Sequence, residues 1–126
     1  MRALVVDDSR AMRMMMRRLM EGFGFEVFDA GNGVEALAAL DAHGHVDVAL
    51  VDWHMPEMDG ITFIGELQKE RERFKIRTVM VSAETDFKKV VFALKNGADE
   101  YLMKPVTKEG LAEKLTILGL LSEVSA

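Results

Sequence analysis

Short apolar runs alternate along the chain with segments in which apolar positions recur at helical spacing. Runs typical of buried strands lie at 4–6, 25–28, 46–51, 78–81 and 101–103. The spacing predicts helices at 10–20, around 34–40, around 61–67, at 86–95 and at 107–121. Five strand–helix units with short connections predict a parallel sheet with helices on both faces. The predicted fold class is therefore α/β: a doubly wound, flavodoxin-like parallel sheet of five strands in the order 2-1-3-4-5, with five helices.

Capping residues support several of these helices. Asn32, followed three residues later by Glu35, forms the pattern of a capping box. Asp59 and Thr107 stand directly before two further helical patterns and can cap them. Glycines mark the expected ends of the first and fourth helices, at Gly22, Gly24 and Gly97. A charged stretch at 69–73 leads into the fourth strand.

The first and fourth helices carry apolar residues that need assignment to the core or to the surface. In the first, we expect the core face to consist of Met12, Met15, Met16 and Leu19. In the fourth, we expect it to consist of Phe87, Val91 and Leu94. Phe92 then falls on another face, between Lys88 and Lys95. It is either an exposed aromatic in a partner-binding surface or an ordinary partly buried side chain.

Composition narrows the class of protein. The 126 residues, 49% hydrophobic and 29% charged, fit a single globular domain at 1–126 with no separate output domain. The absence of cysteine excludes disulfides, thiolate metal sites and thiol catalysis. The net charge of −5 opposes binding to nucleic acid and anionic membranes. Because the chain has neither a signal peptide nor an apolar run near the ~18 residues of a membrane span, we expect a cytoplasmic protein.

Polar residues follow four of the predicted strands, at the edge where open α/β sheets bind ligands. They are Asp7, Asp8 and Ser9, then Asp52, then Ser82 and Glu84, and finally Lys104 and Pro105. Two carboxylates ~4 Å apart repel by ~4 kcal/mol at an effective dielectric near 20, so three of them together favour a bound cation. Oxygen ligands suit Mg²⁺ or Mn²⁺. With one lysine and one hydroxyl, such a site could hold a phosphoryl group attached to an aspartate.

Each of these residues also has a plain structural interpretation. Asp8 or Ser9 can cap the first helix without any metal nearby. Asp52 can be a turn residue, and Lys104 an exposed charge in a loop. The phosphoryl site is favoured because the residues follow separate strands that end at the same edge.

At these residues the sequence resembles the receiver domain of two-component response regulators, and in layout the single-domain, CheY-like chemotaxis regulators. The resemblance runs from about residue 2 to residue 121. It is carried by the stretches at 7–9, 52–60, 81–84, 96–101 and 104–105, which occur in the expected order and spacing.

The resemblance implies a role for each matching position. Asp52 would be the phosphoacceptor, and Mg²⁺, or Mn²⁺, would be held by Asp7, Asp8, Asp52 and the backbone carbonyl of His54. Lys104, followed by a cis bond to Pro105, would pair with the phosphoryl group, and Ser82 would donate a hydrogen bond to it. Tyr101 would be an aromatic switch that follows Ser82 inward, the alternative being a half-buried strand aromatic. His54 and Glu84 would flank the path of attacking water and tune phosphoryl lifetime, although an exposed loop histidine is the alternative for His54.

The implied function is a stand-alone, phosphorylation-activated switch. It would accept a phosphoryl group from a histidine kinase or histidine phosphotransfer domain, and would promote its own phosphorylation and dephosphorylation without being an ordinary enzyme. An effector protein would bind a surface on the fourth helix, fifth strand and fifth helix that includes Phe92 and Tyr101. A monomer or a weak phosphorylation-dependent dimer is expected, in chemotaxis or related signalling.

Several alternatives stay open at this point. The chain could be a phosphorelay intermediate or phosphate sink with no effector, or a receiver excised from a larger regulator. A Mg²⁺-dependent phosphohydrolase of another α/β family is disfavoured because no Asp-x-Asp motif follows the first strand. A nucleotide-binding protein is disfavoured because no glycine-rich loop follows it.

Overall fold

The five strands form one parallel sheet in the order β2-β1-β3-β4-β5, as predicted. The computed structural model describes residues 1–70 and 75–122, so most of the charged stretch expected at 69–73 lies outside the described residues. The strands are β1 (Arg2–Val6), β2 (Glu26–Ala30), β3 (Val48–Asp52), β4 (Arg77–Ser82) and β5 (Glu100–Met103). Because β1, β3 and β4 are covered on both faces, they are apolar almost throughout.

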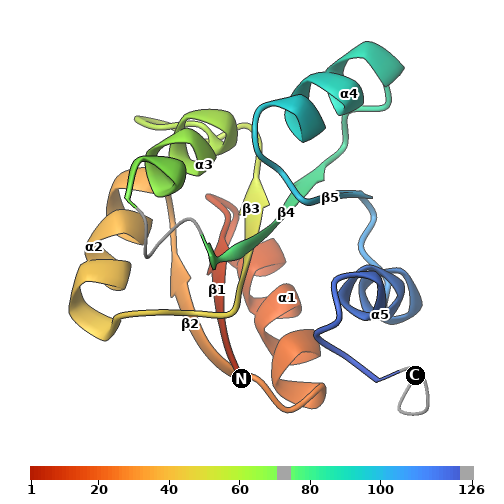
Figure 1. Cartoon of the computed structure of the whole chain (residues 1–126). Coiled ribbons are helices and arrows are strands. Elements are labelled where there is room, and N and C mark those ends of the chain that lie inside the picture. The colour runs from red at the N-terminus through yellow and green to blue at the C-terminus, as the bar shows by residue number, and fades with distance from the viewer. Residues whose placement is uncertain (71–74, 123–126) are drawn as a thin grey trace.

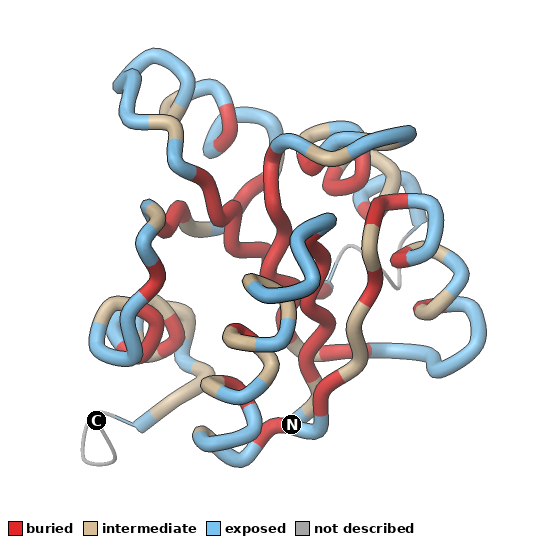
Figure 2. Tube along the Cα trace, turned by 180° about the vertical axis from the view of Figure 1, so that it is seen from behind, coloured by how far each residue is buried: buried red, intermediate tan, exposed pale blue. Residues whose placement is uncertain are grey.

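Helices cover both faces of this sheet (Figure 1). They are α1 (Arg10–Gly22), α2 (Gly33–His43), α3 (Gly60–Lys69), α4 (Phe87–Lys95) and α5 (Lys108–Ile117). On one face, Met16 and Met20 of α1 share a core with Leu111 and Leu115 of α5. On the other face, α2, α3 and α4 contribute a second core that includes Leu40, Phe63 and Ala93. Figure 2 shows the buried residues concentrated along the central strands. Within the described residues, no helix has the length and apolar character needed to cross a membrane.

The predicted helix caps are confirmed. The side chain of Asn32 accepts a hydrogen bond from Glu35 N–H at 2.9 Å and donates one to the Glu35 carboxylate at 3.0 Å. Asp59 accepts from Thr62 N–H, and Thr107 accepts from Gly110 N–H. Each cap satisfies an N–H group that the first turn of the helix leaves without a partner.

Two helices end at different residues from those expected. Helix α1 runs through Gly22 and stops at Gly24, whose φ of 96° is a left-handed conformation that favours glycine. Helix α5 ends at Ile117, four residues before the expected end at residue 121. Gly119 has a φ of 76°, and Leu120 N–H donates to Leu115 C=O at 2.9 Å, which is the pattern of a Schellman ending. The apolar residues after Ile117 therefore pack as an irregular segment.

The core face predicted for α4 is wrong. Phe87 is 77% exposed and Leu94 is 43% exposed. The buried face instead contains Ala93, with Val90 packed against the same core. Apolar residues recur at helical spacing on both faces of α4. The face with the larger side chains was predicted to be buried, but the structure buries the face that contains the small Ala93.

The core face predicted for α1 agrees with the structure. Met16 is fully buried, and Met12, Met15 and Leu19 are partly buried against the core below α1. On α4, Phe92 is 50% exposed, which agrees with its expected place off the core face and leaves its part in partner binding a prediction.

Candidate functional site

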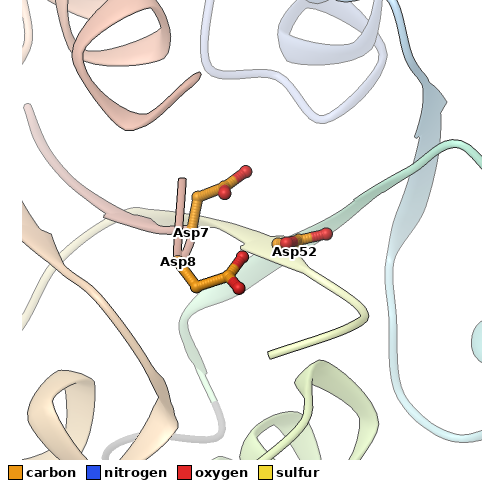
Figure 3. A group of neighbouring side chains, drawn as sticks. All are labelled: Asp7, Asp8 and Asp52. Atoms are coloured by element: carbon orange, nitrogen blue, oxygen red, sulfur yellow. The ribbon is translucent and has the colours of Figure 1, made fainter. Parts of the chain in front are cut away.

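Three carboxylates meet where β1 and β3 end. Asp7 and Asp8 follow β1, and Asp52 is the last residue of β3, which pairs directly with β1. One carboxylate oxygen from each residue lies within 4.8 Å of the others. Figure 3 shows the three side chains gathered at this edge of the sheet. Asp7 and Asp52 are buried and Asp8 is exposed, so the cluster has one side open to solvent.

Lys104 is the cation of this cluster. It follows β5, and its backbone N–H donates to Ser82 C=O at 2.9 Å. Its Nζ lies 3.3 Å from an oxygen of Asp7 and 3.4 Å from an oxygen of Asp52. The Lys104–Pro105 peptide bond is cis, as the resemblance implies. A single ammonium group thus contacts the two buried carboxylates.

Asp52 has a strongly raised pKa. Burial, and next the charge of Asp7, raise the pKa of Asp52 from 3.8 to about 6. Lys104 opposes this shift, both through its charge and through its hydrogen bond, while Asp8 adds a smaller increase. At neutral pH Asp52 is mostly ionised, so its carboxylate can act as a nucleophile.

The cluster has the composition of a divalent-cation site. Three carboxylates and the ammonium group of Lys104 together leave an excess of negative charge that a single divalent cation would balance. The oxygens are hard donors on a partly open rim, which suits Mg²⁺ because this ion keeps several of its waters. Asp7, Asp8 and Asp52 therefore fit the expected metal.

The two expected switch residues both contact Glu84, in the connection between β4 and α4. Ser82 Oγ accepts from Glu84 N–H at 3.1 Å, and Tyr101 O–H donates to Glu84 C=O at 2.9 Å. Ser82 is 1% exposed and Tyr101 is 6% exposed, so both are buried. Tyr101 is thus more deeply buried than a half-buried strand aromatic, and its role as a switch stays a prediction. Because a hydroxyl can accept and donate together, the Ser82 proton stays available to another acceptor.

The expected rate-tuning residues stand at the margin of the site. His54 is exposed, and its ring lies 5.8 Å from that of Trp53. The Glu84 carboxylate accepts from Asp86 N–H and pairs with Lys89 at 3.1 Å. The Asp86 hydrogen bond and then Lys89 hold the pKa of Glu84 below its usual value. These contacts direct Glu84 toward α4.

Trp53 is an aromatic centre that the sequence alone did not assign. Its indole is stacked with Phe92 at 6.3 Å between ring centroids and meets Tyr101 edge-on at 6.5 Å. Phe92 therefore lies against Trp53, the residue that follows Asp52. The sequence signal for this role was a tryptophan directly after Asp52, at the end of a predicted strand.

Gly60 and Arg13 also support the site without having been predicted to do so. Gly60 N–H donates to Trp53 C=O at 2.8 Å, and a Cβ on Gly60 would stand 2.5 Å from Asp52 O. Only a glycine lets α3 begin this close to the β3 backbone. Arg13 donates to the Asp7 carbonyl at 2.7 Å while facing Asp29 at 3.9 Å. Helix α1 is thus attached to the end of β1.

Comparison with known proteins agrees with this geometry. The family model of the response regulator receiver domain matches residues 3–116. The chain is 37% identical over 119 residues to the chemotaxis protein CheY1 of Helicobacter pylori, covering 94% of this chain and 96% of that one.

Solved structures give the same result. The structure of the Vibrio cholerae chemotaxis protein CheY4 superposes with a TM-score of 0.85 at 31% identity, covering 92% of this chain and 96% of that chain. A two-component response regulator/GGDEF domain protein superposes with a TM-score of 0.86 at 30% identity over 95% of this chain, which spans half of that longer chain. The chain therefore belongs to the response regulator receiver domain family, and its relatives include CheY chemotaxis proteins.

Proposed function

We propose that this chain is a response regulator receiver that accepts a phosphoryl group on Asp52 with the help of Mg²⁺ or Mn²⁺. The observation that carries the proposal is the contact of one lysine with two buried carboxylates, beside a third carboxylate open to solvent. The donor would be a phosphohistidine on a histidine kinase or on a histidine phosphotransfer domain.

Asp52 is the nucleophile in this proposal. One of its oxygens attacks the phosphorus atom, a new P–O bond forms, and the P–N bond to the donor histidine breaks. The electron pair of the P–N bond leaves with the imidazole. The Lys104 ammonium group and the Ser82 hydroxyl then bind phosphoryl oxygens, because Lys104 already contacts Asp52 and Ser82 ends β4, the strand paired with β3. Such transfer depends mainly on positioning and on charge.

Asp7, Asp8, Asp52 and the His54 carbonyl would hold the metal ion. When bound, the ion supplies positive charge to the phosphoryl oxygens. Asp7 is fixed for this role, because its carboxylate accepts from Ser9 N–H at 2.8 Å. Ser9 in turn caps α1 by accepting from Met12 N–H at 3.3 Å. Capping and metal binding thus fall to different residues, and the capping alternative is realised by Ser9.

The phosphoryl group would be lost by hydrolysis. A water molecule attacks phosphorus, the P–O bond to Asp52 breaks, and inorganic phosphate leaves. His54 and Glu84 lie two residues beyond Asp52 and Ser82, respectively, where they can affect the approach of water. Because hydrolysis returns Asp52 to its starting state, the protein would act as a switch and not as an ordinary enzyme.

Phosphorylation would alter the surface formed by α4, β5 and α5. Ser82 and Tyr101 contact the same residue, Glu84, so a change at Ser82 reaches both Tyr101 and the start of α4. We propose that an effector protein binds there, in contact with Phe92 and close to Tyr101. The relatives that are chemotaxis proteins favour a role in chemotaxis. We also propose a cytoplasmic location and a monomer or weak phosphorylation-dependent dimer.

Transfer from a protein donor tests this function. A histidine phosphotransfer domain carrying labelled phosphohistidine should lose its label to this chain when Mg²⁺ is present, and chelation should stop the transfer. If the phosphotransfer domain keeps its label at every Mg²⁺ concentration, the proposal is contradicted. Rapid transfer with no phosphorylation-dependent binding partner would instead favour a phosphorelay intermediate or phosphate sink.

A further inference from the structure

Phe92 belongs partly to the interior and partly to the surface. Half of its surface is exposed, yet its ring is nearly parallel to the indole of Trp53, with 9° between the planes. An offset, near-parallel pair at this separation is a favourable aromatic arrangement. The same side chain therefore contacts both solvent and the residue bonded to Asp52.

Trp53 has contacts with α3, α4 and β5. Trp53 is 9% exposed, and its carbonyl is fixed by Gly60 N–H at the start of α3. Tyr101 packs edge-on against its indole and is itself bonded to Glu84. The indole thus joins the backbone of Asp52 to α4 through Phe92 and to β5 through Tyr101.

Phe87 offers a matched comparison on the same helix. It has the same side chain, lies in the first turn of α4, and is 77% exposed. Among the described residues, no aromatic ring stacks with it, whereas Phe92 stacks with Trp53. Any effect specific to Phe92 therefore reports the contact with Trp53 and not the general loss of an exposed aromatic from α4.

We infer that Phe92 is a positioning residue that acts on Asp52 through Trp53. The placement of α4 sets the position of the indole, and the indole sets that of the Asp52 backbone. Helix α4 thereby controls how fast Asp52 gains and loses a phosphoryl group. This inference rests on the proposed phosphoacceptor role of Asp52. Because coupling is reciprocal in equilibrium binding, occupancy of the acidic site also changes the preferred position of Phe92.

The test compares Phe92→Ala with Phe87→Ala and with Phe92→Tyr. Trp53 is the one tryptophan of the chain, so its fluorescence reports this contact directly. Phe92→Ala should shift the emission to longer wavelength, because water reaches the indole. With a small acyl phosphate and Mg²⁺, it should also change the phosphorylation rate, measured by intact mass, by about two- to tenfold, the size expected for an aromatic pair.

The two other variants separate positioning from simple damage. Phe87→Ala should leave both the emission and the rate as in the wild type. Phe92→Tyr keeps an aromatic ring at this position and should do the same. The inference is wrong if Phe92→Ala and Phe87→Ala change the rate equally, or if Phe92→Ala shifts the emission and leaves the rate unchanged.

A further measurement covers the case in which the wild type accepts no phosphoryl group. That result would sink the proposed function, and the coupling is then tested with Mg²⁺ alone. Phe92→Ala should shift the Mg²⁺ concentration at which the Trp53 fluorescence change is half complete by about two- to tenfold, and Phe87→Ala should not. An unchanged midpoint in Phe92→Ala would refute the coupling.

Discussion

Asp52 illustrates at the scale of one residue how a site for chemistry weakens the fold that contains it. Its carboxylate is buried beside another buried carboxylate, with Lys104 as a partial counterion. The pKa of Asp52, raised to about 6 by burial first and by Asp7 next, records this cost. Carboxylates with a raised pKa are concentrated at functional sites.

The raised pKa predicts a pH-dependent gain in stability for Asp52→Asn in the absence of metal. Between about pH 4 and pH 6 the folded state binds more protons at Asp52 than the unfolded state, so the contribution of Asp52 to stability falls as pH rises. Above pH 6, Asp52→Asn should therefore be the more stable protein, by about 1 kcal/mol after allowance for solvent screening. The advantage should shrink toward pH 4.

Urea unfolding across this pH range measures the effect. Asp59→Asn is the matched control, since Asp59 lies in the connection that follows Asp52 and asparagine also caps helices well. Parallel stability curves for the wild type and Asp52→Asn from pH 4 to pH 8 would contradict the electrostatic explanation.

A second prediction at this scale concerns Glu57, which has a φ of 67° in the loop after Asp52. A left-handed conformation costs an ordinary residue about 1 kcal/mol, and asparagine tolerates it better. Glu57→Asn should therefore raise the free energy of unfolding by about 0.5 kcal/mol. Glu57→Gln removes the same charge without easing the backbone. If thermal unfolding shows equal gains in both variants, the effect belongs to the charge.

At the scale of elements, the sequence predicted the acidic strand ends and the helix starts well, because both depend on local chemistry. Asn32, Asp59 and Thr107 cap the helices that they were expected to cap. The buried face of α4 was predicted wrongly, because packing against the core selects Ala93 over larger neighbours. The contacts of Trp53 depend on three separate elements, and no local pattern contains that information.

Helix α3 provides a paired prediction for two glycines. A Cβ at Gly60 would lie 2.5 Å from Asp52 O and 3.0 Å from Trp53 Cα, and both atoms are backbone. Gly60→Ala should therefore destabilise the fold by about 2 kcal/mol or more, since the end of β3 must move. A Cβ at Gly65 would meet no atom within 4 Å, so Gly65→Ala should stabilise the helix by about 0.5–1 kcal/mol.

Thermal unfolding of the two α3 variants checks this pair. Opposite shifts in melting temperature are expected. If Gly60→Ala melts like the wild type, the close approach of α3 to Asp52 is not required by the fold.

At the scale of the whole molecule, the sheet brings together residues that are far apart in the chain. Asp7, Asp52 and Lys104 stand at the ends of three different strands, and they contact one another because parallel strands end at one edge. The sequence alone predicted this meeting, since it needed only the strand order. The same order places α4 and β5 beside β4, where Ser82 and Tyr101 share Glu84. The strand order therefore places the acidic site and the surface of α4 and β5 close enough to be linked through Glu84.

The most direct test of the central claim is the intact mass of the protein after incubation with a small acyl phosphate and Mg²⁺. The wild type and Asp59→Asn should each gain one phosphoryl group, while Asp52→Asn and chelator-treated wild type should gain none. An unmodified wild type, or an equal gain in Asp52→Asn, would contradict the assignment of Asp52 as the phosphoacceptor.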